Sequence, residues 1–245
     1  MDLKIKDVAE LLNVSETTIR RWLAEGKIPA YRLHHQYRFS RIEIENWVMS
    51  CKLKKEGKEN KEESNMFGEK LLYAKEEEYG YNLKRGMQQF SLYRAIHKGN
   101  VLIDITGITK EDYIRSSVEI IAKELILDAD VLAELLLDRE SLMPTALNHG
   151  IAVPHTRDFL LKGSEDIISI VYPKDPLDWG ALDGILVHTL FFLFACDDKR
   201  HLHLLAKLAH LSSSKEALDF LQTKPPKQQL LDFIKQWEAA LHLET

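Results

Sequence analysis

Three polar residues in the second half of the chain could together bind and accept an anionic group. His155 ends the segment NHGIAVPH, directly after Pro154, whose ring restricts the backbone in front of the imidazole. Arg139 lies upstream in the triplet DRE, and His201 follows the apolar run that ends at Cys196. A neutral imidazole is a nucleophile near pH 7, and a guanidinium binds phosphate oxygens. Phosphoryl acceptance is one reading of His155, although a lone histidine beside an apolar run is also typical of a structural side chain.

A metal site is the competing interpretation of these histidines. Its ligands would be His149, His155, His201 and His203. His201 and His203 are two residues apart in a predicted helix, so they point to different faces. No HExxH motif or facing carboxylate pattern accompanies them. We therefore expect no metal site and no cofactor.

The elements around these residues predict an α/β domain that begins at about Phe90. Thr109 and Asp112 form a capping-box pattern for a helix that ends near Leu125. The apolar runs Ile167–Val171 and Leu186–Ala195 are typical of central strands. Further helices are predicted at residues 130–138, 197–211, 215–222 and 227–241. This order indicates a mixed β-sheet flanked by helices, with residues 148–158 ending in a loop and His201 in the first turn of a helix, where free amides favour phosphate.

Residues 1–50 contain the helix-start and helix-end signals of a small helical module. Ser15 is a good N-cap for a helix over residues 16–25, and Gly26 is placed to end it. Shorter patterns predict helices at residues 6–12 and 41–49, with two short strands around Arg32 and Arg38 between them. A helix, a turn, a second helix, a hairpin and a third helix make a winged helix-turn-helix arrangement.

Basic residues gather in this module although the chain as a whole has a net charge of −5. Residues 20–41 contain five arginines and Lys27 against Glu25 alone. A basic stripe on a near-neutral module predicts contact with phosphates of double-stranded DNA. The residues expected to contact DNA are Ser15, Thr17, Thr18, Arg20, Arg21, Arg32 and Arg38. Trp22 and Trp47 are expected in the core of the module.

Residues 51–89 differ from both neighbours, and the stretch 51–64 (CKLKKEGKENKEES) is rich in mixed charges and nearly free of apolar side chains. This composition predicts a solvated linker, part of which (65–78) could form a helix. The 245-residue chain has no N-terminal signal core and no apolar run long enough to span a bilayer, and its two cysteines lack zinc spacing. We therefore expect a cytoplasmic protein of three segments, at residues 1–50, 51–89 and 90–245, without membrane contact.

The segment LLLDRESLMPTALNHGIAVPHT resembles the active-site region of enzyme IIA domains of the bacterial phosphotransferase system, of the fructose, mannitol and nitrogen-regulatory type. The downstream segment FLFACDDKRHLHLLAKLAHL resembles the strand and helix that carry the second active-site histidine of this family. The resemblance covers residues 90–240. It implies that His155 is the phosphoryl acceptor, His201 its pocket partner and Arg139 an anion-stabilising residue. It also implies that a histidine phosphocarrier protein is the donor, so that the chain is a phosphoryl carrier and not a stand-alone enzyme.

The first 50 residues resemble the excisionase and MerR-like helix-turn-helix family. The two resemblances together predict a DNA-binding regulator that couples phosphorylation of its IIA domain to transcription. Thr156 and His149 differ from the glycines usual in IIA domains, and they favour an alternative, a IIA-like docking regulator without phosphoryl transfer. In a third possibility the IIA domain still transfers phosphoryl groups, but residues 1–50 bind a protein instead of DNA. Helix-turn-helix readers commonly bind as dimers, so homodimerisation stays open.

Overall fold

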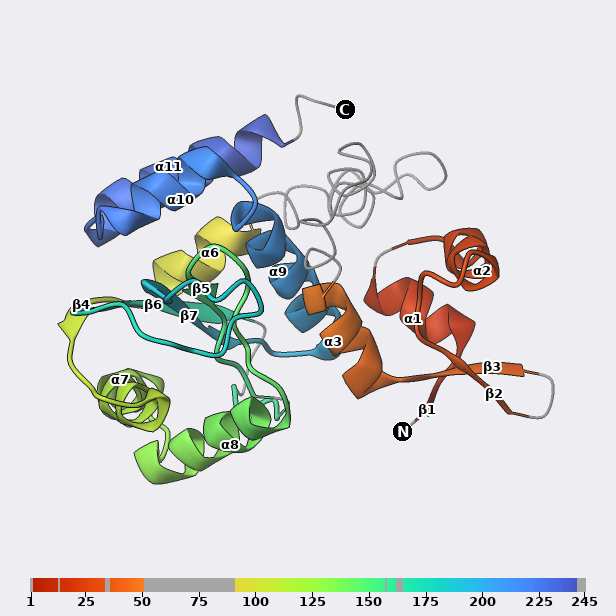
Figure 1. The fold of residues 1–245 in the computed structure, drawn as a ribbon, viewed down its shortest axis with the longest axis horizontal. Helices are drawn as coiled ribbons and strands as arrows, with labels where there is room; N and C mark the ends of the chain where they lie inside the picture. The colour runs from red at the N-terminus through yellow and green to blue at the C-terminus, as the bar shows by residue number, and fades with distance from the viewer. Residues whose placement is uncertain are drawn as a thin grey trace. The chain divides into compact units, whose positions relative to one another are not determined.

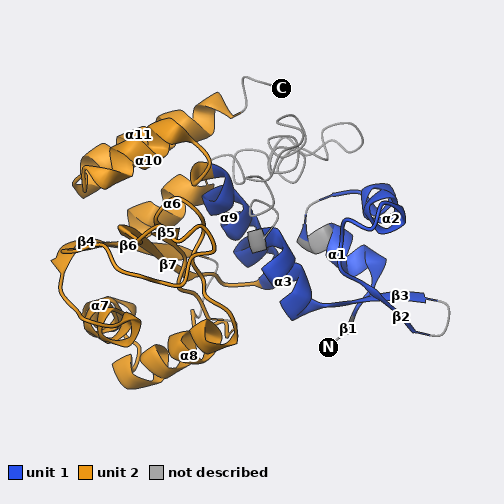
Figure 2. Cartoon of the chain, viewed as in Figure 1, with its two compact units in different colours: residues 1–80, 198–210 blue, residues 81–197, 211–245 orange. Residues whose placement is uncertain are grey.

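A computed structural model describes residues 2–12, 14–33, 36–50, 91–156, 158–161 and 165–241. The predicted linker at 51–89, its helix at 65–78 and the His34-His35 link of the hairpin lie outside the described residues. The chain divides into two compact units. One unit contains residues 1–80 and 198–210, and the other contains residues 81–197 and 211–245 (Figure 2).

The first unit combines short helices with a small antiparallel sheet. Its helices are α1 (Ile5–Leu11), α2 (Glu16–Ala24), α3 (Arg41–Ser50) and most of α9 (Asp198–Leu211). Its strands are β1 (Asp2–Leu3), β2 (Tyr31–Leu33) and β3 (Gln36–Ser40), in the order β1-β3-β2. The helices and hairpin predicted for residues 1–50 are therefore present, and β1 adds one strand that the sequence did not indicate.

Helix α2 is fixed at both ends by local chemistry. The Ser15 hydroxyl accepts a hydrogen bond from the amide of Thr18 at 3.1 Å, and Gly26 follows the helix with a φ of 65°. Ile19 and Trp22 on the inner face of α2 are buried. The Trp22 ring lies 5.6 Å from the half-buried ring of Trp47 on α3. Trp22 therefore belongs to the core of this module, as predicted.

The second unit contains the predicted mixed sheet. Its strands are β4 (Val101–Ile105), β5 (Ile151–Ala152), β6 (Ile167–Pro173) and β7 (Thr189–Phe194). They lie in the order β4-β6-β7-β5. The β4–β6 and β5–β7 pairs are parallel, whereas β6 and β7 are antiparallel. The central strands β6 and β7 are buried along nearly their whole length, which explains their continuous apolar sequences.

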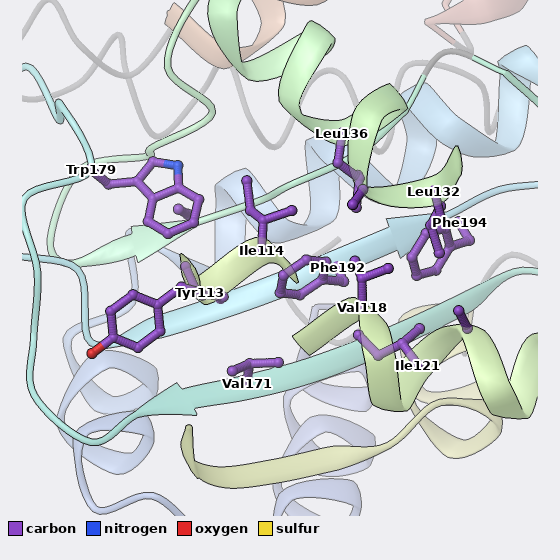
Figure 3. Close-up of a cluster of buried hydrophobic side chains, with 14 of the residues drawn as sticks. Tyr113, Ile114, Val118, Ile121, Leu132, Leu136, Val171, Trp179, Phe192 and Phe194 are labelled. Carbon is purple, nitrogen blue, oxygen red and sulfur yellow. The ribbon is translucent and has the colours of Figure 1, made fainter. Parts of the chain in front are cut away.

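Helices cover both faces of this sheet (Figure 1). They are α6 (Ser91–Lys98), α7 (Lys110–Leu125), α8 (Ala129–Leu142), α10 (Lys215–Gln222) and α11 (Lys227–Ala240). The pair α7 and α8 lies on one face, with α6, α10 and α11 on the other. Figure 3 shows how apolar side chains of α7 and α8 pack onto Val171 of β6 and Phe192 and Phe194 of β7. No helix in the described parts of the chain has the length and apolarity to cross a membrane.

Two sets of hydrogen bonds fix the starts of helices in the second unit. The predicted capping box of α7 is confirmed: Thr109 Oγ1 accepts from the Asp112 amide at 3.2 Å, and Asp112 accepts from the Thr109 amide at 2.8 Å. Hydrogen bonds from the amides of Thr109 and Ile108 lower the pKa of Asp112. Glu238 of α11 is buried and accepts from the amides of Leu92 and Tyr93 at the start of α6. This carboxylate ties the C-terminal helix to the first helix of the domain.

The structure corrects two boundaries and adds elements that were not predicted. The predicted strand Leu186–Ala195 is wrong at its start, because Leu186 is exposed and β7 begins at Thr189. The predicted helix 130–138 extends to Leu142, so Arg139 lies on a helix. The stretch before His155 contains the two-residue strand β5. Helix α6 and strand β4 were not predicted.

Candidate functional site

The segment before His155 folds back on itself as a tight hairpin. Leu147 N–H donates to the carbonyl oxygen of Ile151 at 2.7 Å, and Val153 N–H donates to that of Thr145 at 3.0 Å. His149 and Gly150 in the turn have φ values of 66° and 79°. This left-handed backbone is natural for glycine but strained for histidine. The hairpin brings residues 145–147 beside β5, which in turn pairs with the central strand β7.

Gly150 is required by space as well as by conformation. A Cβ atom at this position would lie 2.5 Å from a carbon of the His188 ring and 2.9 Å from the carbonyl oxygen of Leu186. The His188 amide donates to the Gly150 carbonyl oxygen at 2.8 Å. The turn is thereby held against the segment that leads into β7.

His155 lies two residues beyond Val153, the last residue of the hairpin, in the extended continuation of β5. It forms a parallel bridge with Leu193, whose amide donates to the carbonyl oxygen of Pro154 at 3.0 Å. The His155 side chain has an exposed fraction of 0%. The imidazole is therefore covered on all sides in this structure.

The ring of His155 is oriented by a backbone carbonyl. His155 Nδ1 lies 2.7 Å from the carbonyl oxygen of Val153. A carbonyl oxygen only accepts hydrogen bonds, so Nδ1 carries the proton in this contact. In the neutral ring the lone pair then belongs to Nε2. The nitrogen that can attack an electrophile is therefore Nε2.

Arg139 lies near the end of α8 and is buried, with an exposed fraction of 3%. Its Nη1 donates to the carbonyl oxygen of Met143 at 3.1 Å. Arg139 and His155 belong to the same unit, whereas His201 belongs to the other.

Sequence reasoning assigned no role to Glu140, the neighbour of Arg139. Glu140 is buried, and its carboxylate accepts from the Thr145 amide at 3.1 Å and from the Thr145 hydroxyl at 2.5 Å. Lys110 Nζ lies 3.4 Å from the same carboxylate and donates to the carbonyl oxygen of Trp179 at 2.9 Å. The only sequence signal for this contact is a carboxylate in an apolar helix, five residues before a threonine at the start of a hairpin.

His201 lies in the first turn of α9, as predicted, and is buried. Its Nδ1 lies 3.9 Å from Oε1 of Glu45, a fully buried carboxylate on α3. In the same unit Arg41 of α3 forms an ion pair with Asp198 at the start of α9, and a second one with Glu45 at 3.2 Å. Two charged side chains of α3 therefore lie against the first turn of α9.

His188 is half-buried, with Nδ1 2.8 Å from the hydroxyl oxygen of Thr189. Desolvation lowers the pKa of His188, against an opposing hydrogen bond with the backbone of His149. The folded protein therefore binds the His188 proton more weakly than the unfolded chain does.

We expect the free energy of unfolding to fall as the pH drops below about 6.5, the pKa of a free histidine. Urea unfolding at pH 7.5 and pH 5.5 measures this fall, which we expect to be smaller in His188→Gln. The matched control is His97→Gln, because His97 is exposed on α6. An equal pH dependence in wild type and His188→Gln would contradict this role for His188.

The described residues contain no group of three or more His, Cys, Asp or Glu side chains placed to hold a metal ion. His149 is exposed in the hairpin turn, whereas His155 is buried beyond it. His210 on α9, like His188 just before β7, is partly buried.

The predicted DNA-contacting residues of α2 divide into two groups. Ser15 and Thr18 bond to one another at the start of the helix, with 2.9 Å between their hydroxyl oxygens. Thr17, Arg20 and Arg21 are exposed. The two arginines form only surface pairs with acidic residues of the same segment, at 3.5 Å for Arg20–Glu16 and 4.0 Å for Arg21–Glu25. Exposed pairs of this kind contribute little energy, so both guanidinium groups can exchange partners.

The two arginines of the hairpin are positioned by their own strands. Arg32 on β2 is exposed and lies over the ring of Tyr37, 5.7 Å from its centroid. Arg38 on β3 donates to Gln36 Oε1 at 2.7 Å and to the carbonyl oxygen of Tyr37 at 3.1 Å. The hairpin thus presents two cations on neighbouring strands.

Comparison with known proteins assigns two ranges of the chain to families. Residues 94–237 match the family "Phosphoenolpyruvate-dependent sugar phosphotransferase system, EIIA 2", and residues 3–52 match a helix-turn-helix domain. The "Nitrogen regulatory protein" of Pseudomonas aeruginosa is 32% identical over 147 residues, which cover 58% of this chain and 94% of that protein. The "Transcriptional repressor DcmR" of Methylorubrum extorquens is 48% identical over 48 residues, 19% of this chain and 18% of that protein.

A solved structure supports the fold assignment. The crystal structure of the nitrogen regulatory protein IIA-Ntr from Neisseria meningitidis superposes with a TM-score of 0.50 at 26% sequence identity, over 56% of this chain and 93% of that one. The family match spans more than half of the chain and includes both candidate histidines and Arg139. This chain therefore belongs to the EIIA type-2 family of the phosphoenolpyruvate-dependent sugar phosphotransferase system, with a helix-turn-helix domain at its N-terminus.

Proposed function

We propose that this chain is a bacterial DNA-binding regulator whose IIA domain accepts a phosphoryl group on His155 from a histidine phosphocarrier protein. The phosphorylation state of His155 then alters DNA binding by residues 1–50. In this proposal the chain is a phosphoryl carrier that acts in the cytoplasm, where it meets both the carrier protein and DNA.

The observation that carries this proposal is the contact between His155 Nδ1 and the Val153 carbonyl oxygen at 2.7 Å. It assigns the proton to Nδ1 and the lone pair to Nε2. Attack by Nε2 forms a new N–P bond as the N–P bond of the carrier's phosphohistidine breaks. The electron pair of the broken bond returns to the carrier imidazole, so the transfer exchanges one phosphoramidate for another.

Charge stabilisation is the second requirement of phosphoryl transfer. We assign it to Arg139 and to His201, with the backbone amides at the start of α9. Support comes from the match of residues 94–237 to the family, a range that contains Arg139 and His201. In this proposal Arg139 and His201 supply the cationic groups that the transfer needs.

The direct test uses the purified full chain with a histidine phosphocarrier protein, its kinase and phosphoenolpyruvate. We expect one acid-labile phosphoryl group per chain. No label on wild type under conditions that label the carrier itself would overturn the phosphoacceptor assignment.

A second candidate function is a docking regulator that binds partner proteins without phosphoryl transfer. The complete burial of the His155 side chain favours it. The same assay separates the two, because the docking regulator binds its partner without becoming labelled. Labelling that is slow, and accelerated by mild urea, would instead indicate the opening motion that a buried acceptor requires.

We assign DNA binding to the exposed face of α2 and to the hairpin. Support comes from the exposure of Thr17, Arg20 and Arg21. In helix-turn-helix proteins the second helix enters the major groove. Ser15 and Thr18 would then approach the DNA at the N-terminus of α2, where free amides favour phosphate. Arg32 and Arg38 would contact the flanking backbone from β2 and β3.

Coupling between the two activities is proposed to run through His201 and Glu45. Their 3.9 Å separation supports this, because Glu45 lies on α3 of the helix-turn-helix region. A phosphoryl group near His201 would favour the protonated imidazole and so strengthen its attraction to the Glu45 carboxylate. The position of α3 would then respond to phosphorylation.

Replacing Glu45 with glutamine should therefore reduce the coupling. We expect the ratio of DNA dissociation constants between phosphorylated and unphosphorylated protein to move toward one. Fluorescence anisotropy with a DNA duplex measures both constants. Glu43→Gln is the matched control, since Glu43 is exposed on the same helix. An unchanged ratio in Glu45→Gln would exclude this route.

A further inference from the structure

The backbone of Val153 is held on both sides. Its carbonyl oxygen accepts from His155 Nδ1 at 2.7 Å, and its amide donates to the carbonyl oxygen of Thr145 at 3.0 Å. The position of the Val153 backbone therefore bears on the direction of the His155 ring. Any shift of Thr145 moves the carbonyl that keeps the proton on Nδ1.

Thr145 is in turn held by Glu140. The Thr145 amide is 3.1 Å from each Glu140 carboxylate oxygen, and the Thr145 hydroxyl donates to Oε2 at 2.5 Å. Thr145 and Glu140 have exposed fractions of 1% and 7%, so water does not replace these bonds. Glu140 lies on the last turn of α8, next to Arg139.

We propose that Glu140 is a positioning residue for His155, acting through Thr145 and the backbone of Val153. The proposal rests on the proposed function, in which His155 Nε2 is the phosphoryl acceptor. Glu140 touches neither the phosphoryl group nor the imidazole. It fixes the start of the hairpin, and so it fixes the tautomer and the direction of the nucleophile.

A carboxylate suits this position because only donors converge on it. They are the amide and hydroxyl of Thr145 and the ammonium of Lys110, which lies 3.4 Å from Oε1. An ionised carboxylate offers acceptors on both oxygens, whereas glutamine offers one acceptor and an NH₂ group that also donates. Glu140→Gln therefore keeps the size of the side chain but turns one contact into a clash between donors.

The first readout is the tautomer of His155, which requires no phosphoryl transfer. Nitrogen NMR of the full chain with ¹⁵N-labelled histidine distinguishes Nδ1–H from Nε2–H. We expect a single Nδ1–H tautomer in wild type and a mixture of both tautomers in Glu140→Gln. Wild-type signals for His155 in a folded Glu140→Gln would overturn the proposal.

The second readout is the rate of phosphorylation by the carrier. A misdirected nucleophile lowers the rate of transfer, and we expect a fall of about tenfold to 100-fold in kcat with an unchanged KM for the carrier. Thr145→Ser keeps both donors and should retain the wild-type rate, whereas Thr145→Val loses the hydroxyl and should show an intermediate rate. Equal rates in these two variants would contradict the proposed contact chain.

A control variant and a second test variant separate the positioning effect from a general loss of folding. Glu119→Gln makes the same chemical change on the exposed face of α7 and should match wild type in both readouts. If Glu140→Gln does not fold, Thr145→Val carries the test, and a wild-type tautomer in Thr145→Val then overturns the proposal. If wild type is never phosphorylated but Glu140→Gln shifts the tautomer, the proposed function fails while the positioning role stands.

Discussion

Replacing His155 with alanine is expected to abolish acid-labile phosphorylation of the full chain. The reason is chemical: alanine has no nucleophile, and a phosphoramidate needs the Nε2 lone pair that the Val153 contact assigns to His155. Incubation with the carrier protein, its kinase and labelled phosphoenolpyruvate, followed by gel analysis at alkaline pH, measures the label. His97→Ala removes an exposed histidine from α6 and should be labelled like wild type.

The loss of label must be separated from loss of folding. His155→Ala removes a buried ring and leaves the Val153 carbonyl oxygen without its donor, which costs about 1–3 kcal/mol in the free energy of unfolding. Urea unfolding and circular dichroism measure this cost. A folded His155→Ala that still carries the label would place the acceptor on another residue and overturn the assignment of His155.

Local patterns in the sequence predicted local structure well. The capping box of Thr109 and Asp112 could be read directly because both partners lie within one helical turn, and the structure confirms it. The Ser15 cap of α2 is correct for the same reason. The buried strands β6 and β7 were found because both faces of each strand are covered, which requires continuous apolar sequence.

The missed elements lack such a local signal. Strand β4 is partly exposed and includes Asp104, so its sequence has neither the apolar continuity nor the alternation of a typical strand. Leu186 was assigned to the strand because it is apolar, but it is exposed, after a turn in which Gly184 has a φ of 68°. Strand β5 has two residues, too few for a periodic pattern.

The candidate site also combines features that the sequence indicates locally with features that depend on long-range packing. The residue types and order of Arg139, His155 and His201 indicated phosphoryl chemistry without any coordinates. The tautomer of His155 could not be predicted, because it depends on the bend of residues 145–153 and on the direction of one carbonyl. The burial of Glu140 and its contact with Thr145 depend on the packing of α8 against this hairpin. Burial depends on long-range contacts that a single sequence does not display.

Replacing both Arg20 and Arg21 with alanine is expected to weaken DNA binding at least about tenfold. Both side chains are exposed on α2, and their pairs with Glu16 and Glu25 are weak surface contacts. Each lost phosphate contact should reduce the slope of log K against log salt by about 0.9. Anisotropy titrations with a mixed-sequence DNA duplex at several salt concentrations measure both quantities.

The control for this double variant must remove the same charge elsewhere. Lys123→Ala combined with Lys235→Ala takes two exposed cations from α7 and α11 and gives the same net charge. If affinity depended only on net charge, the two double variants would bind DNA equally. A lower affinity and a shallower salt slope in the Arg20 and Arg21 variant alone would assign the contact to α2. Wild-type affinity and slope in that variant would instead move the DNA-binding surface away from α2 and favour protein docking by residues 1–50. Because both arginines are exposed, the free energy of unfolding should change by less than about 0.5 kcal/mol, so a change in binding would reflect contact and not folding.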